Sequence, residues 1–347
     1  MSGQQRSAPQ LARAAWDALN AGRLAEAAAA FDEARKLAPQ EPSLLLGAAL
    51  VAHLQSRADD ARRHLIDALA IDPALTPASL LLGEVLYRAG DLDGAMGVYE
   101  RALTLAPDNA QVKTRLDAWR KEAALHGRFG QKLGDHFTVL FEGPAEAALA
   151  ERAVALLEAA YWRIGAALYT YPADVITVVL YTREQFRDIT QSPDWAGGAF
   201  DGRIRVPVQG ALENPREFER VLSHELTHAF VRSIAPRGVP VWLNEGLAVR
   251  FEGRDLSKEL ELVRRAPAPV GLPRLAQPFA KLSGAEARLA YAESAAAARA
   301  LLDQAGAPAV VNLLEAVGRG TGFEEAFLRY IQIPFADFLR SLDASGR

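Results

Sequence analysis

The sequence predicts an α+β protein in two parts: an all-helical repeat array, then an α+β domain with a small sheet and a helical half. Three observations lead to this prediction. Residues recur every 34 positions through the first 125 residues, short β-branched segments follow up to residue 208, and helical patterns dominate from about residue 216. A chain of 347 residues is also long for one hydrophobic core. We therefore expect a domain at 8–125, a connector at 126–135 and a second domain at 136–347.

The composition is that of an ordinary globular protein. Hydrophobic residues make up 50% of the chain and charged residues 24%, with a formal net charge of −4. This balance gives no electrostatic reason to expect a nucleic-acid partner. The short basic cluster of Arg120, Lys121, Arg128 and Lys132 is interpreted as a solvated connector. The absence of cysteine excludes disulfides and thiolate metal sites.

No targeting or membrane-spanning segment is expected. The first residues, MSGQQRSAPQ, lack the apolar core of a signal peptide. No run of about 18 apolar residues occurs anywhere in the chain, so a spanning helix is not predicted. The expected location is the cytoplasm, or the periplasm or extracellular space if the chain is a processed form.

The first third of the chain is a repeat with a period of 34 residues. The columns in register are Pro39, Pro73 and Pro107; Ala34, Ala68 and Ala102; Ala27, Ala61 and Ala95; Phe31, Leu65 and Tyr99; and Gly22, Ser56 and Gly90. Each unit has the pattern of two amphipathic helices joined by a turn and closed by a proline, which cannot continue the second helix. Small alanines let the paired helices approach closely. A further helix at about 110–125 is expected to cap the last open apolar face.

This repeat resembles the tetratricopeptide repeat, which has the same period and the same order of alanine, aromatic and proline positions. The resemblance implies an all-α solenoid whose concave groove holds peptides or partner proteins. Six first-helix positions are expected to face the groove, and they are mostly apolar: Ala12, Trp16, Leu46, Leu50, Leu80 and Glu84. They do not resemble the Lys/Asn clamp that some tetratricopeptide domains use for a C-terminal carboxylate. They either bind a partner or pack within the array or on the second domain.

The second part begins with a small sheet. HFTVLFEG at 136–143 alternates apolar residues like a strand, 145–169 has the pattern of a long helix, and DVITVVLY at 174–181 is β-branched like a buried strand. Asp201-Gly202 signals a turn. The segment 203–208 after it is predicted to be an edge strand, because Pro207 cannot donate a ladder hydrogen bond in the centre of a sheet.

The motif HELTH lies in a predicted helix at 217–233. His224 and His228 are four residues apart, so both imidazoles lie on one face and can reach one metal ion. Glu225 is adjacent and can reach a water on that ion. H-E-x-x-H is the zinc-peptidase pattern. The alternative is an ordinary half-buried helix with two hydrogen-bonded histidines.

A third metal ligand is predicted downstream. VPVWLNEGLAVRFEG at 239–253 is a helix pattern that begins at Pro240 and ends at Gly253. Glu245 stands in its apolar middle, where a carboxylate is costly to bury unless it is paired or bound to metal. It follows His228 by 17 positions, enough for an antiparallel helix to return to the same point. A catalytic zinc needs such a third ligand and an open position.

HELTH followed by WLNEGLA resembles the gluzincin metallopeptidases, in particular the peptidase MA-like domain and the catalytic domain of M1-family aminopeptidases. The resemblance covers residues 136–347 and implies one zinc ion per chain, held by His224, His228 and Glu245, with Glu225 as general base. The second histidine and the glutamate are two residues closer together than in the M1 pattern, which favours the MA-like group.

Two further features resemble the M1 enzymes. The segment 290–306 is similar to the helix that carries a tyrosine supporting the transition state, which implies this role for Tyr291. Gly198, Ala199 and Phe200 stand where those enzymes bind the substrate backbone. The glutamate of that motif, which recognises the free amine, is absent.

The residue types define the expected chemistry. Zinc lowers the pKa of water towards ~7, and Glu225 takes the proton and passes it to the leaving amine. Zinc and Tyr291 would share the developing oxyanion. Glu252 and Asp255 are candidates to orient the imidazoles. The sequence leaves two alternatives: a tetratricopeptide scaffold with an inactive second domain, or a zinc hydrolase that acts on something other than peptides.

Overall fold

The computed structural model describes residues 7–55, 57–190, 198–209, 211, 213–253, 255–266, 270–277, 279, 282 and 284–345. The chain divides into two compact units, Met1–Gly127 and Arg128–Arg347. Each unit has its own hydrophobic core.

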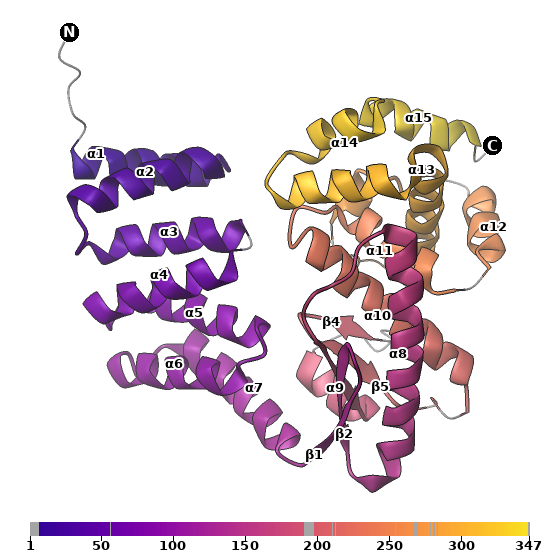
Figure 1. Cartoon of the computed structure of the whole chain (residues 1–347), viewed down its shortest axis with the longest axis horizontal. Helices are drawn as coiled ribbons and strands as arrows, with labels where there is room; N and C mark the ends of the chain where they lie inside the picture. Colours follow the sequence, from indigo (N-terminus) through magenta and orange to yellow (C-terminus); the bar gives the residue numbers. More distant parts are fainter. Residues whose placement is uncertain are drawn as a thin grey trace. The chain divides into compact units, whose positions relative to one another are not determined.

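The N-terminal unit is a stack of helix pairs closed by a single helix (Figure 1). Each helix packs against the one before it and the one after it in the sequence. This is the all-α solenoid that the 34-residue period predicts. Its helices are α1 (Ala8–Asn20), α2 (Leu24–Leu37), α3 (Pro42–Leu54), α4 (Ala58–Ile71), α5 (Thr76–Arg88), α6 (Leu92–Leu105) and α7 (Ala110–His126).

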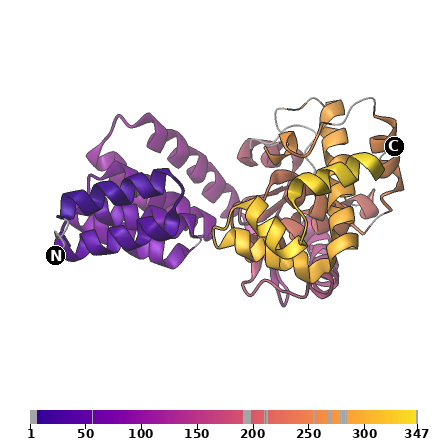
Figure 2. The ribbon, with the colours of Figure 1, turned by 90° about the horizontal axis from the view of Figure 1, so that it is seen from above.

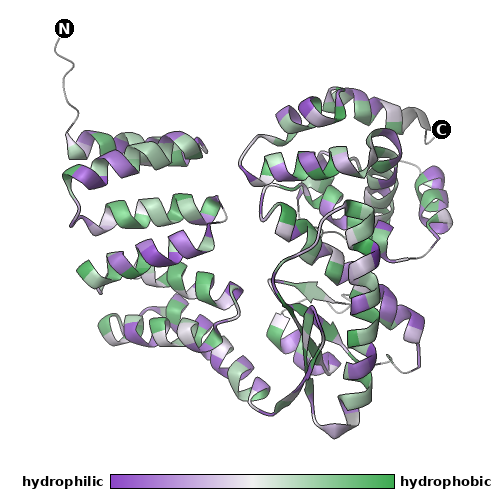
Figure 3. Ribbon diagram, viewed as in Figure 1, coloured by the Kyte–Doolittle hydropathy of each residue, from purple (hydrophilic) through white to green (hydrophobic). Residues whose placement is uncertain are grey.

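Small and large residues of the repeat interlock in the core. The repeated alanines are buried, and the large side chains of Phe31, Leu65 and Tyr99 are buried beside them. A Cβ at Gly47 would lie 2.2 Å from the Phe31 ring, and one at Gly83 would lie 2.2 Å from the Tyr99 ring. Gly47 therefore makes room for the aromatic slot of the preceding repeat, and Gly83 for that of its own repeat. The central helix α3 is mainly hydrophobic, whereas α4 alternates hydrophilic and hydrophobic residues (Figure 3).

The turns follow the repeat as well. Gly22 and Gly90 adopt φ values of 73° and 86°, a backbone conformation that favours glycine. The third residue of this column, Ser56, lies outside the described residues. At the end of the array, Trp119 of α7 stacks on Tyr87 with the rings 5.2 Å apart, and its neighbour Glu122 accepts a 2.7 Å hydrogen bond from the Tyr87 hydroxyl. The last helix therefore covers the final pair.

Several positions predicted to face the groove pack within the array. Leu46 is buried in the core, and Leu50 and Leu80 pack against the same cluster. Trp16 makes an edge-to-face contact with Phe31, with the ring centroids 5.2 Å apart. Glu84 is paired with an arginine of α7. These contacts give the apolar positions a structural role inside the array.

The C-terminal unit begins with a mixed five-stranded sheet in the order β1-β2-β3-β5-β4. The pairs β1–β2 and β4–β5 are antiparallel, and β2–β3 and β3–β5 are parallel. Helices α8 and α10 pack against the sheet and against each other, and α9 packs on β3 and β5. The elements up to α10 are β1 (Phe129–Leu133), β2 (Phe137–Glu142), η1 (Pro144–Glu146), α8 (Ala147–Leu168), β3 (Ile176–Tyr181), α9 (Arg183–Thr190), β4 (Ala199–Phe200), β5 (Ile204–Pro207) and α10 (Pro215–Ile234).

Two predictions about this sheet were wrong. The stretch 126–135 is not a plain connector, because Phe129–Leu133 forms β1 and pairs with β2. Its burial is weak and its residues are partly polar, so it lacks a clear strand pattern. The segment 203–208 is not at the edge, because β4 lies outside β5. Pro207 is tolerated there because β4 is short and pairs only with Ile204 and Arg205.

The helical half packs on α10 and α8 through α11 and α13. Helix α11 packs tightly on α13, since a Cβ at Gly246 would lie 2.2 Å from the Ser294 carbonyl oxygen. Helix α13 is broken at Gly306, where φ is 77°, shortly before Pro308. Figure 2 shows α14 and α15 lying over α13. The remaining elements are α11 (Val241–Phe251), α12 (Ser257–Arg265), η2 (Arg274–Ala276), α13 (Gly284–Gly318), α14 (Phe323–Ile331) and α15 (Phe335–Ser345).

Among the helices of the described residues, none combines the length and the apolar character that crossing a bilayer requires.

Candidate metal centre

Helix α10 presents the two histidines of the motif on one face. The helix begins at Pro215 after Asn214, whose side chain caps the backbone N–H of Glu217. Its apolar residues face the core, and the imidazoles of His224 and His228 lie 4.9 Å apart between ring centroids. The i, i+4 spacing therefore brings both rings to one point.

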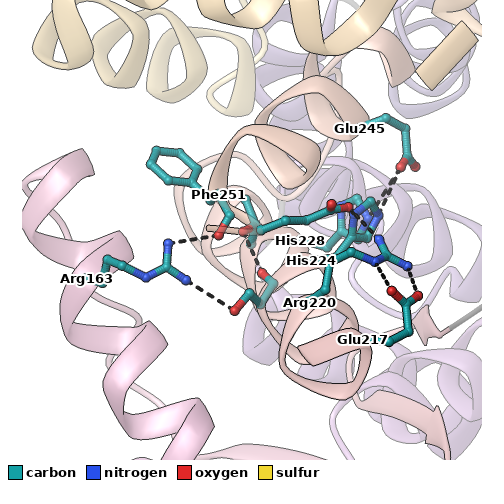
Figure 4. Close-up of polar contacts among 10 residues, drawn as sticks. Arg163, Glu217, Arg220, His224, His228, Glu245 and Phe251 are labelled. Carbon is teal, nitrogen blue, oxygen red and sulfur yellow. Dashed lines mark hydrogen bonds and ion pairs between the residues drawn. The ribbon is translucent and has the colours of Figure 1, made fainter. Parts of the chain in front are cut away.

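Glu245 of α11 completes a cluster of three groups. Its Oε2 atom lies 3.4 Å from His224 Nε2 and 3.6 Å from His228 Nε2. One potential ligand atom from each residue lies within 4.8 Å of the others. Figure 4 shows the Glu245 carboxylate directed at the two imidazoles. The structure thus brings together the three residues that the sequence predicts as metal ligands.

The donor set fits a metal ion. Glu245 Oε2 is shielded from solvent and accepts no hydrogen bond, although it lies beside two imidazoles. Burial would raise the pKa of Glu245, but the nearby His228 and His224 outweigh it and keep that pKa below its usual value. An ionised carboxylate and two imidazole nitrogens at a single point are the ligand types of a zinc site.

Glu252 orients the first histidine. Its side chain is 1% exposed, and its Oε1 atom accepts hydrogen bonds from His224 Nδ1 at 2.9 Å and from Arg220 Nη1 at 2.7 Å. This bond leaves His224 Nε2 directed at Glu245. Of the two candidates named from sequence, Asp255 is not engaged in this way: it accepts hydrogen bonds from the backbone and hydroxyl of Ser257.

Arginines that sequence reasoning missed support this arrangement. Arg220 donates hydrogen bonds to Glu217 through Nε and Nη2 and to Glu252 through Nη1 (Figure 4). Arg163 of α8 donates hydrogen bonds to the Phe251 carbonyl and the Ser223 hydroxyl, at 2.9 and 3.2 Å. Arg220 precedes His224 by four residues, so its helical spacing was a usable signal, whereas nothing local marks Arg163.

Glu225 is buried beside the cluster. Burial raises the pKa of Glu225, and the neighbouring His224 and His228 oppose that rise. Residue Gly198 lies against this carboxylate: a Cβ there would be 2.6 Å from Glu225 Oε1. The predicted backbone-binding segment Gly198–Phe200 therefore runs beside the motif helix, and Ala199 and Phe200 form the edge strand β4.

Tyr291 of α13 lies beside the cluster. Its ring centroid is 6.3 Å from that of His224 and 5.2 Å from that of Phe279. Burial raises the pKa of Tyr291 well above its usual value, and the carboxylates of Glu245 and Glu225 add to the rise. The hydroxyl therefore stays protonated at neutral pH and is able to donate a hydrogen bond.

Two cavities meet at this centre. Both are lined by Gly198, His224, Glu225 and Tyr291. One of about 570 Å³ extends towards α12 and is called the α12 cavity. The other, of about 370 Å³, extends towards the 235–240 loop between α10 and α11 and is called the loop cavity. An extended ligand that crosses the centre would have room on both sides.

Comparison with known proteins agrees with the fold and motifs. Residues 160–334, half of the chain, match the sequence profile of the Peptidase MA superfamily. The chain belongs to this superfamily, and its N-terminal third carries tetratricopeptide repeats, with profile matches at 12–76 and 52–116.

Other comparisons are more distant. Curated protein sequences gave no match. One solved structure, described as "First TPR of Spaghetti (RPAP3) bound to HSP90 peptide SRMEEVD", is 21% identical to this chain with a TM-score of 0.33. The aligned region covers 35% of this chain and 99% of the other chain.

Proposed function

We propose that this protein is a zinc-dependent peptidase whose tetratricopeptide array recruits a peptide segment or a partner protein. The observation that carries the proposal is the convergence of His224, His228 and Glu245, with potential ligand atoms within 4.8 Å of one another. The cluster stands beside a buried Glu225, in a chain of the Peptidase MA superfamily.

His224, His228 and Glu245 would hold one zinc ion per chain. Two imidazoles and one carboxylate form a common set of protein ligands at catalytic zinc sites, where a further position stays open for water or substrate. A bound zinc ion supplies Lewis acidity, which makes water acidic near neutral pH and polarises a carbonyl group. The Glu252 carboxylate would keep the His224 ring in place by accepting a hydrogen bond from its Nδ1–H group.

Glu225 would act as general base and then as general acid. Its carboxylate takes a proton from the attacking water as the water oxygen bonds to the substrate carbonyl carbon. It returns the proton to the amide nitrogen as the carbon–nitrogen bond breaks. The raised pKa of the buried Glu225 favours the first step, because a carboxylate with a higher pKa is a stronger base towards the attacking water.

Tyr291 would stabilise the charge that develops on the carbonyl oxygen. A hydroxyl that stays protonated donates a hydrogen bond that strengthens as the oxygen becomes negative. Gly198, Ala199 and Phe200 would pair with the substrate backbone, because β4 is an edge strand and its outer backbone groups have no strand neighbour in the described sheet. The absence of a Cβ at Gly198 leaves room for the Glu225 carboxylate.

The repeat array would work as a separate recruiting domain. Its boundary with the peptidase domain is proposed at Gly127, where the first compact unit ends. A stack of three helix pairs with a closing helix buries its own apolar faces, which supports independent folding.

Cleavage of a peptide library, measured together with zinc content, tests the proposal. Zinc-loaded protein is expected to cleave peptides within the library. Protein stripped by a chelator should lose this activity and regain it when zinc is restored. A zinc-loaded protein that cleaves no peptide but hydrolyses another acyl substrate would replace the proposal with a different hydrolase.

A further inference from the structure

The loop between α10 and α11 carries a cation without a partner. Arg237 lies in this 235–240 loop and lines the loop cavity together with His228, Glu245 and Tyr291. Its Nε and Nη2 atoms are shielded from solvent, and among the described residues they have no acceptor within hydrogen-bond distance. A guanidinium with two buried unpaired donors is costly unless a ligand satisfies them.

Burial also acts on the charge of this group. Desolvation lowers the pKa of Arg237, and no acidic residue compensates for it. The guanidinium remains charged at neutral pH, because arginine titrates far above that range. The loop therefore keeps a permanent, incompletely solvated positive charge beside the metal centre.

The two unpaired nitrogens are the ones that hold carboxylates elsewhere in this chain. In the repeat array, Arg115 binds Glu84 through Nε at 2.8 Å and Nη2 at 3.0 Å. On α10, Arg220 binds Glu217 through Nε at 2.8 Å and Nη2 at 2.6 Å. This side-on fork matches the two oxygens of a carboxylate. Arg237 offers the same fork with no carboxylate in it.

The two cavities differ in charge. Outside the metal cluster and Glu225, the loop cavity is lined by two cationic side chains, Arg232 and Arg237, and by no acidic one among its described residues. The α12 cavity is balanced, with three basic and three acidic side chains besides Glu225. With the metal cluster and Glu225 set aside, the lining of the loop cavity has a net positive charge that favours an anionic substrate group, and the lining of the α12 cavity does not.

The loop that carries Arg237 packs closely against the C-terminal end of α13. Gly238 adopts a φ of 77°, and a Cβ there would lie 2.8 Å from a methyl group of Val317. On the neighbouring residue of α13, a Cβ at Gly318 would lie 2.9 Å from the Ala235 Cα atom. Close packing on both sides of Arg237 fixes the backbone from which this side chain extends.

We propose that Arg237 is a specificity-determining residue that binds a carboxylate of the substrate in the loop cavity, on one side of the bond to be cleaved. This inference rests on the proposed peptidase function, because it assigns the chemistry of the substrate that the same centre takes. The carboxylate comes either from the C-terminus of a peptide or from an aspartate or glutamate side chain. Both sources present two oxygens to the Nε/Nη2 fork.

Equilibrium binding tests this assignment without requiring turnover. The probes are three fluorescent pools of random hexapeptides built from neutral residues: one with a free C-terminal carboxylate, one amidated, and one amidated with a single glutamate. Each pool is titrated into the zinc-loaded Glu225→Gln protein. We expect one of the carboxylate pools to bind more tightly than the neutral amidated pool.

The Arg237→Met substitution should remove this preference. It should weaken binding of the preferred pool about 10- to 100-fold and leave the neutral pool unchanged, as expected for loss of a charged hydrogen-bonded pair. Arg237→Lys should restore little, because an ammonium lacks the side-on fork. The matched control Arg319→Met removes an exposed arginine just after α13 that pairs with Glu315, and it should retain the full preference.

The outcomes separate this inference from the proposed function. Loss of preference confined to the free-acid pool identifies the C-terminus as the source, and loss confined to the glutamate pool identifies a side chain. Equal binding of all pools, or a preference that survives Arg237→Met, overturns the assignment even if the enzyme cleaves peptides. Peptide binding that depends on Arg237 in a wild-type protein without cleavage would overturn the peptidase proposal alone.

Discussion

The repeat array and the peptidase domain bury different kinds of side chain. In the array, the described buried residues are almost all apolar, and the buried carboxylate of Glu122 is bound by the Tyr87 hydroxyl. In the C-terminal unit, five of the described buried residues are charged, and two of them, Glu225 and Glu252, lie where α10 meets α11. Glu245 lies beside them with a shielded oxygen that accepts no hydrogen bond.

This difference separates residues that hold the fold from the residues to which we assign chemistry. A packed apolar core gains stability from every buried group, whereas a buried carboxylate costs stability unless a partner or a ligand satisfies it. The core of the array is packed with apolar side chains almost throughout. The α10–α11 region departs from this packing at the motif residues, so changes there should alter activity and metal binding before they alter the fold.

The largest effect is expected for Glu225→Gln. The amide keeps the size of the side chain but cannot take the proton of the attacking water, so turnover should fall by about 10³-fold or more while zinc content stays unchanged. Turnover, zinc content and circular dichroism are measured on the same preparation. Glu219→Gln, an exposed change on the same helix, is the control. Activity of Glu225→Gln within tenfold of the wild type would contradict the assignment of the base.

Tyr291→Phe should have the next largest effect. Removing the hydroxyl takes away a donor to the developing oxyanion, so kcat should fall by about 10²- to 10³-fold with little change in KM. Tyr169→Phe, at a residue that is 77% exposed, should leave both constants unchanged. An unaltered kcat for Tyr291→Phe would assign the side chain to packing against Phe279.

Glu252→Gln should weaken zinc binding about 10- to 100-fold, because the neutral amide holds the Nδ1–H of His224 less strongly than a carboxylate does. A competition titration with a zinc chelator measures the affinity. Asp255→Asn is the matched control, since Asp255 only caps α12 through Ser257. Equal losses in the two variants would show that the effect is not specific to the hydrogen bond with His224.

The smallest effect on chemistry is expected for removal of the array. A chain that begins at Arg128 keeps β1 and therefore the whole described sheet, so it should bind zinc and cleave short peptides at the wild-type rate. Cleavage of long or protein substrates should become less efficient, because the recruiting surface is gone. Equal efficiency on every substrate would contradict recruitment, and loss of zinc on truncation would contradict independent folding.

The repeat and the motif were predictable from sequence because both leave a periodic signal. The 34-residue columns mark the helix pairs of the array, and the positions of His224, His228 and Glu245 follow from helix geometry and one return of the chain. Strand β1 was missed because Phe129–Leu133 is half-exposed and partly polar, so its identity depends on the neighbouring strand. The interior position of β5 was also missed, because it depends on pairing with the short strand β4.

Side chains that act through tertiary contacts leave no such signal. Glu252 was one of two candidates, and the structure distinguishes it by its bonds to His224 and Arg220. Arg237 follows a helix in an ordinary Pro-Arg-Gly turn, and its lack of an acceptor depends on everything packed around the loop. The types of metal ligand can be predicted from the sequence, whereas the unpaired charge of Arg237 can be recognised only from its surroundings in the structure.

The most direct test of the central claim is an anomalous difference map from crystals of the zinc-loaded protein, collected on both sides of the zinc absorption edge. The account predicts one strong peak per chain at the point bounded by His224 Nε2, His228 Nε2 and a Glu245 carboxylate oxygen. It also predicts that the peak disappears in His228→Ala. A peak at another position, or no peak in zinc-loaded wild-type protein, would contradict the assignment of this cluster as the metal centre.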